Sequence, residues 1–222
     1  MTSPSPLASS DPPPEAERSS GPLLGLLARG LELWLRQQCD AIRELDIVLE
    51  GSMAQMLRGH LQGVRLRARE VVFQDLYLEQ VDLRSDPIQF TATGLLRGRS
   101  LSLNHPFHVR GFVRFTGEGL SRSLVTPAWR ELGDHLCLQL LGVVPLEGVT
   151  LLDDRLVLRA RPADGAAAEV ETRMALLAEG LALCPLDGRP PLPLPMDGAI
   201  ALERAEVRGG QLELAGVALV RP

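Results

Sequence analysis

Alternating apolar and polar residues between positions 101 and 115 constrain the fold of this chain more than any other feature. The segment reads LSLNHPFHVRGFVRF, and its odd-numbered positions are apolar except for His105 and Gly111. Successive side chains of a β-strand point to opposite faces of the sheet, so this spacing predicts one long strand over 101–115 with one apolar face. The apolar face comprises Leu101, Leu103, Phe107, Val109, Val113 and Phe115, and the polar face carries Ser102, Asn104, His108, Arg110 and Arg114.

The remaining periodicity predicts an α+β protein. A helical pattern covers 22–43, and a second one covers 116–142 with a break at Pro127, because proline cannot continue a helix without a kink. The order helix, strands, helices, strands is typical of an α+β fold with an antiparallel, meandering sheet. Shorter elements are expected as a helix at 52–59 and as strands at 45–49, 64–68, 76–83, 146–152, 155–161, 169–178, 181–184, 199–207 and 211–220.

Composition predicts one domain preceded by a tail. Hydrophobic residues make up 45% of the 222 residues, which is enough for a packed core. Residues 1–20 are rich in Pro and Ser and predict a disordered tail, whereas 21–222 are expected to form a single domain. The run RPPLPLP at 189–195 is expected to be an extended surface linker.

The helical segment 22–43 has an unusually wide apolar arc, which includes Leu31 and Trp34. Its polar face is narrow, so the helix must either be enclosed by other elements or lie on an apolar surface such as a membrane. The sequence leaves both possibilities open. The polar face carries Arg29, Glu32, Arg36, Asp40 and Arg43.

No sequence motif predicts catalysis or metal binding. The three cysteines lie far apart, and His105 and His108 fall on opposite faces of a strand, which is poor geometry for one metal ion. No serine lies in a G-x-S-x-G motif, and no glycine-rich phosphate-binding loop follows a strand. Asp153 and Asp154 are expected to be turn residues. We therefore expect a protein that is not an enzyme and needs no cofactor or metal.

The charge pattern argues against nucleic-acid binding. The formal net charge is −5, and all 23 basic residues are arginine, as a GC-rich genome would favour. Arg65, Arg67 and Arg69 alternate on one strand. Two interpretations stay open: a solvated face paired with acidic residues, or contact with anionic lipid head groups, which is worth roughly 1 kcal/mol for each basic residue.

The first 20 residues lack the basic stretch and apolar stretch of a secretory signal. Charged residues interrupt the apolar stretch that follows, so a membrane-spanning helix is not expected there. These features predict a cytoplasmic location, which allows peripheral contact with a plasma or thylakoid membrane.

Two segments resemble the LmeA-like phospholipid-binding family of actinobacteria and cyanobacteria, and the resemblance extends over about residues 45–220. The first segment, 49–90, matches at Leu49, Gly51, Ser52, Met56, Leu57, Gly59 and Leu61. The second, 106–127, matches at Phe115, Thr116, Leu120, Ser121, Ser123 and Leu124. The resemblance implies a tubular lipid-binding-like fold, in which a long curved antiparallel sheet wraps around helices and leaves an apolar groove for acyl chains. The arginine-only composition and the Pro-rich tail would suit a cyanobacterial member.

Two functional hypotheses follow from these observations. In the first, the protein is a non-enzymatic phospholipid-binding protein that is peripheral to a membrane and has phospholipid as its partner. In the second, it is a structural or scaffolding protein that uses helix 22–43 to dock a protein partner. The residues expected to contact acyl chains are Leu101, Leu103, Phe107, Val109, Phe115, Leu31 and Trp34, and those expected at the head group are Arg65, Arg67 and Arg69.

Overall fold

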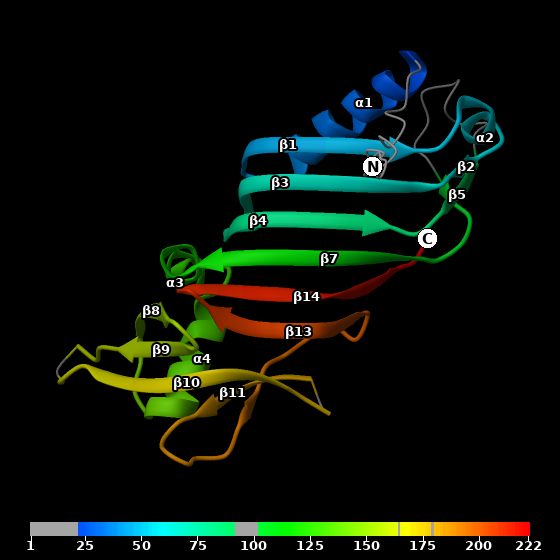
Figure 1. Cartoon of the computed structure of the whole chain (residues 1–222). Helices are drawn as coiled ribbons and strands as arrows, with labels where there is room; N and C mark the ends of the chain where they lie inside the picture. The colour runs from blue at the N-terminus through cyan, green and yellow to red at the C-terminus, as the bar shows by residue number, and fades with distance from the viewer. Residues whose placement is uncertain (1–21, 92–101, 164, 179) are drawn as a thin grey trace, which may run out of the picture.

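The computed structural model describes residues 22–91, 102–163, 165–178 and 180–222 (Figure 1). Its largest element is a six-stranded sheet in the order β1-β3-β4-β7-β14-β13, with every neighbouring pair antiparallel. The strands are β1 (Ala41–Glu50), β3 (Gly63–Phe73), β4 (Leu76–Ser85), β7 (Phe107–Thr116), β13 (Ile200–Arg208) and β14 (Gln211–Val220). The predicted α+β class and its antiparallel sheet are confirmed.

A second, five-stranded sheet packs near the β13 edge of the large sheet (Figure 1). Two helices join the sheets, and they are separated at Pro127 as the sequence predicts. The helices are α3 (Gly117–Val125) and α4 (Arg130–Leu141). The strands run in the order β12 (Leu192–Pro193), β11 (Gly180–Pro185), β10 (Ala168–Leu177), β9 (Arg155–Ala160) and β8 (Leu146–Leu152).

The opposite edge of the large sheet, β1, is covered by helix α1 (Pro22–Gln38) (Figure 1). Beyond the end of β1, Ser52 caps the short helix α2 (Met53–Leu57) by accepting a hydrogen bond from the Gln55 backbone N–H. A small three-stranded sheet follows, made of β2 (His60–Leu61), β5 (Ile88–Thr91) and β6 (Ser102–Leu103).

Two separate hydrophobic cores hold the described parts together. The larger lies where α3, α4 and the second sheet meet the large sheet, and its most buried members include Leu158 and Leu183. The smaller lies under α1 and α2, with Leu49, Met56, Leu61 and Phe90 at its centre. The smaller core therefore lies beside β1 and β3, whereas the larger one reaches from β13 across to β4.

Four sequence predictions were wrong in detail. The strand over 101–115 is interrupted between β6 and β7, because Pro106 has no N–H to donate to a ladder. Helix 22–43 ends at Gln38, since residues from Ala41 onward pair with β3. The proline run at 189–195 is not only a linker, because Leu192 and Pro193 pair with β11. Strand 76–83 extends two residues further than predicted, to Ser85.

Candidate functional site

One face of the large sheet is apolar across its whole width. Residues paired directly across neighbouring strands point to the same face, so the register defines rows that cross the sheet. Two adjacent rows of this face run through all six strands and contain no charged side chain. One is Leu45, Ala68, Val81, Val113, Leu214 and Ala205, and the next is Ile47, Leu66, Leu83, Gly111, Gly216 and Leu202.

The two cores cover only the margins of this apolar face. Ile47 and Val64 pack against the core under α1, while Val113 and Leu214 pack against the core beside α4. Between these margins lies a set of residues that belongs to neither core and that we name the apolar strip. The apolar strip consists of Leu66, Val81, Leu83, Val109, Gly111 and Leu202, all half-buried.

Glycine creates a recess in the apolar strip. Gly111 pairs with Gly216 on the neighbouring strand, so two adjacent positions carry no side chain. A Cβ atom at Gly111 would approach only the Leu83 Cδ2 atom, at 3.2 Å. Gly216 has a different role: a Cβ atom there would lie 2.4 Å from the Ala201 carbonyl oxygen. Gly216 thus allows β13 and β14 to approach, and Gly111 leaves room on the apolar face.

The structure brings only some of the predicted lipid-contact residues to the apolar strip. Phe107 and Val109 lie on its face of β7 and are half-buried. Phe115, on the same face, is instead a buried member of the core beside α4.

The two predicted residues of α1 differ in burial. Leu31 packs against the core under α1, whereas Trp34 is 53% exposed. Leu101 lies outside the described residues. Leu103 lies on β6, which pairs with β5 in the small sheet rather than with the large sheet.

The opposite face of the large sheet carries charged side chains from β1, β3, β4 and β7. Arg65, Arg67 and Arg69 share this face, because they alternate with Leu66 and Ala68 on β3. Each arginine has an acidic partner: Glu50 at 2.8 Å, Asp82 at 3.6 Å and Glu44 at 3.9 Å, respectively. These arginines therefore point away from the apolar strip, and their contact with a lipid head group stays a prediction.

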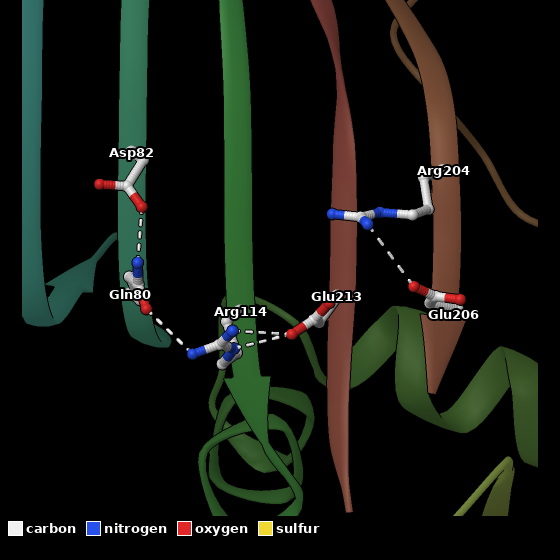
Figure 2. A network of polar contacts seen from close by, with 6 residues as sticks. All are labelled: Gln80, Asp82, Arg114, Arg204, Glu206 and Glu213. Atoms are coloured by element: carbon white, nitrogen blue, oxygen red, sulfur yellow. Dashed lines mark hydrogen bonds and ion pairs between the residues drawn. The ribbon is translucent and has the colours of Figure 1, made fainter. Parts of the chain in front are cut away.

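A polar network crosses this face in the middle of the sheet (Figure 2). Arg114 on β7 donates hydrogen bonds from Nε and Nη2 to Glu213 Oε1 on β14, at 3.1 and 2.7 Å. Its Nη1 donates to Gln80 Oε1 on β4 at 3.0 Å, and Gln80 Nε2 donates to Asp82 Oδ2. The network links three strands through side chains that are partly buried, where hydrogen bonds are stronger than in water.

The polar face also has a shallow cavity of about 540 Å³ over β1, β3 and β4. Three acidic and two basic side chains line it, so its net charge does not favour an anion. The lining residues are Glu44, Leu45, Asp46, Arg67, Ala68, Arg69, Gln80 and Asp82.

The described residues show no arrangement typical of a metal site or a catalytic site. Within them, no group of three or more His, Cys, Asp or Glu side chains could hold a metal ion. Asp154 pairs with Arg155 and Arg173 beside the β8–β9 turn. None of the helices in the described ranges is long and apolar enough to cross a membrane.

Sequence reasoning missed several residues of the apolar strip. The predicted strands contained Leu66, Val81, Leu83 and Leu202, but the predicted lipid-contact residues came only from 101–115 and from helix 22–43. The alternation in each segment was a usable signal. No signal in the sequence indicated which of these strands lie side by side, because strand order depends on pairing between distant segments.

The fold and the apolar strip define an α+β protein whose main sheet carries a continuous apolar face between two cores. The model of the LmeA-like phospholipid-binding family matches residues 20–217. The chain belongs to this lipid-binding family, as its sequence motifs predicted. Neither the curated proteins nor the solved structures compared with it gave a significant match.

Proposed function

We propose that this protein binds a phospholipid without catalysing a reaction, and that an acyl chain lies on the apolar strip. The observation that carries the proposal is the half-buried row through Leu66, Leu83 and Leu202, which neither core covers. Membership of a phospholipid-binding family supports this choice of ligand.

Burial of an acyl chain is sufficient to drive such binding. Each methylene group removed from water contributes about 0.8 kcal/mol. Ligand sites of this kind are mostly apolar and use a few polar groups only for orientation. Phe107 and Val109 extend the apolar face along β7 toward the C-terminal end of β14. The acyl chain would therefore contact Phe107 as well as the apolar strip, to which Val109 belongs.

Native mass spectrometry of the purified full chain, followed by lipid extraction, tests this proposal. We expect a phospholipid at about one equivalent in the wild-type protein and a clear loss in Leu66→Gln and Leu83→Gln. Leu152→Gln is the matched control, because Leu152 is 48% exposed and lies on the second sheet. Equal lipid content in all four proteins would overturn the apolar strip as the site.

We further propose that α1 makes peripheral contact with a lipid bilayer. Leu31 faces the core, but Leu33 on the opposite side of the helix is 61% exposed, and Trp34, beside Leu31 on the helix surface, is 53% exposed. Tryptophan is suited to a membrane–water interface, because one end of its ring is apolar and the other can donate a hydrogen bond.

Flotation with phosphatidylglycerol vesicles separates this proposal from the scaffolding alternative. Trp34→Glu should weaken flotation, whereas Ile200→Glu, which changes a 42% exposed residue on β13, should not. If Trp34→Glu instead abolishes a protein complex and leaves flotation and lipid content unchanged, α1 is a protein-docking helix.

A further inference from the structure

Three arginines lie side by side on the polar face of the large sheet. Arg65 on β3 pairs directly with Arg84 on β4, and Arg84 pairs directly with Arg110 on β7. Residues paired in this way have Cβ atoms roughly 4.5–5.5 Å apart. We name these three residues the arginine row.

The arginine row has too few acidic partners to balance its charge. Glu50 is shared by two of its members, with Oε1 at 2.8 Å from Arg65 Nη2 and Oε2 at 3.4 Å from Arg84 Nη2. Arg110 forms no ion pair with any residue in the described ranges. Within the described residues, Glu50 therefore pairs with only two of the three guanidinium groups, and Arg110 is left without an acidic partner.

The neighbours at both ends of the row are apolar. On β1, Val48 is paired with Arg65, and on β14, Val217 is paired with Arg110. Elsewhere on this face opposite charges meet, as Arg67 does with Asp82 and Arg114 with Glu213. Like charges placed directly across strands destabilise a sheet, so the arginine row departs from the local pattern at a cost in stability.

We infer that Arg84 and Arg110, with Arg65 beside them, form a binding site for a phosphate group. Guanidinium groups donate paired hydrogen bonds that match the oxygens of phosphate. A bound phosphate would supply the negative charge that the row lacks. The arginine row is separate from the apolar strip, because it lies on the opposite face of the sheet, so this inference does not depend on the proposed acyl site.

The phosphate could belong to a lipid head group or to a soluble molecule, and two measurements distinguish these sources. The first titrates the full chain with inorganic phosphate and glycerol phosphate by calorimetry, in chloride buffer of matched ionic strength. The second compares flotation with vesicles of phosphatidylglycerol and of phosphatidylcholine. Ionic strength is held constant because salt screens exposed charges.

The test variants are Arg84→Gln and Arg110→Gln, and the control is Arg159→Gln. Arg159 is 49% exposed and pairs with Glu169 on the second sheet. We expect Arg84→Gln and Arg110→Gln to weaken phosphate binding by about ten-fold or more.

Arg110→Gln should unfold at or above the wild-type temperature, because it removes a like-charge contact and no ion pair of the described residues. Arg84→Gln also removes the 3.4 Å contact with Glu50, which keeps its 2.8 Å contact with Arg65, so its unfolding temperature should stay close to that of the wild type. A folding defect will therefore not obscure the result.

Loss of both soluble-phosphate binding and phosphatidylglycerol flotation in the two variants would identify a head-group site. Loss of soluble-phosphate binding alone would identify a site for a soluble phosphate compound. Unchanged binding in both variants, or an equal loss in Arg159→Gln, would overturn the inference, because binding would then reflect general surface charge.

Discussion

Gly111 on β7 lies directly opposite Gly216 on β14, in the row that also contains Leu83 and Leu202. The two glycines have different roles: Gly216 permits the close approach of β13 and β14, and Gly111 leaves a recess in the apolar strip. The two positions therefore give different predictions.

A larger side chain at Gly111 should fill the recess without unfolding the protein. The new Cβ atom would meet only the flexible end of Leu83, so Gly111→Leu should change the free energy of unfolding by at most about 1–2 kcal/mol. Lipid content measured by extraction should fall. Ala201→Leu, on the exposed polar side of β13, is the control and should keep its lipid. Normal lipid content in Gly111→Leu would show that the ligand lies elsewhere.

Gly216→Ala should destabilise the fold. Its Cβ atom would lie 2.4 Å from the Ala201 carbonyl oxygen and 2.9 Å from the Leu202 Cα atom, both backbone atoms. The strands must shift to relieve this overlap, at a cost of roughly 1–3 kcal/mol in urea denaturation. Gly198→Ala is the control, because no atom lies within 4 Å of its new Cβ atom. Its free energy of unfolding should stay within about 0.5 kcal/mol of the wild-type value. Similar values for both variants would contradict the close approach of β13 and β14.

Loss of Arg114 should cost more than loss of an exposed arginine. Its partner Glu213 has a side chain only 13% exposed, so Arg114→Met leaves a partly buried carboxylate unpaired. We expect the free energy of unfolding, measured by urea denaturation, to fall by about 1–3 kcal/mol. Arg43→Met should lower it by less than about 1 kcal/mol, because the pair of Arg43 with Glu70 is exposed. The double variant Arg114→Met/Glu213→Met should lose less free energy of unfolding than the sum of the losses in its two single variants. If the losses instead add up, the pair contributes nothing to stability.

Cys137 should make stability depend on pH in the alkaline range. Burial, with a smaller contribution from Asp134, raises the pKa of its thiol from 9.0 to about 11. The folded state thus holds the proton to higher pH than the unfolded state. The thiol's contribution to stability is fully present below the unfolded pKa and is lost as pH rises from there through the folded pKa.

Urea denaturation at several pH values between 9 and about 11 measures this effect. The free energy of unfolding of the wild type should fall faster than that of Cys137→Ala, by up to about 1.4 kcal/mol per pH unit. Other ionisable groups contribute equally to both proteins, so the difference in slope reports Cys137. Parallel slopes would show that the thiol titrates normally in the folded chain.

Local features of the sequence were enough to predict most elements. Pro127 separates two helices because its ring and missing N–H disrupt a helix, and α3 and α4 end and begin around it. Alternation in 146–152 and 211–220 predicted β8 and β14 with the observed bounds. The prediction failed where a local pattern continues past a break in the strand: positions 101–115 alternate apart from His105 and Gly111, but Pro106 separates β6 from β7.

The sequence by itself determined that the main sheet has one apolar face and one charged face, because the side-chain period of a strand is a local property. Only the tertiary structure decided which residues become neighbours across strands. The alignment of Arg65, Arg84 and Arg110, and the pairing of Gly111 with Gly216, arise from strand order and register. These depend on contacts between segments far apart in the chain, which the periodicity of a single segment does not encode.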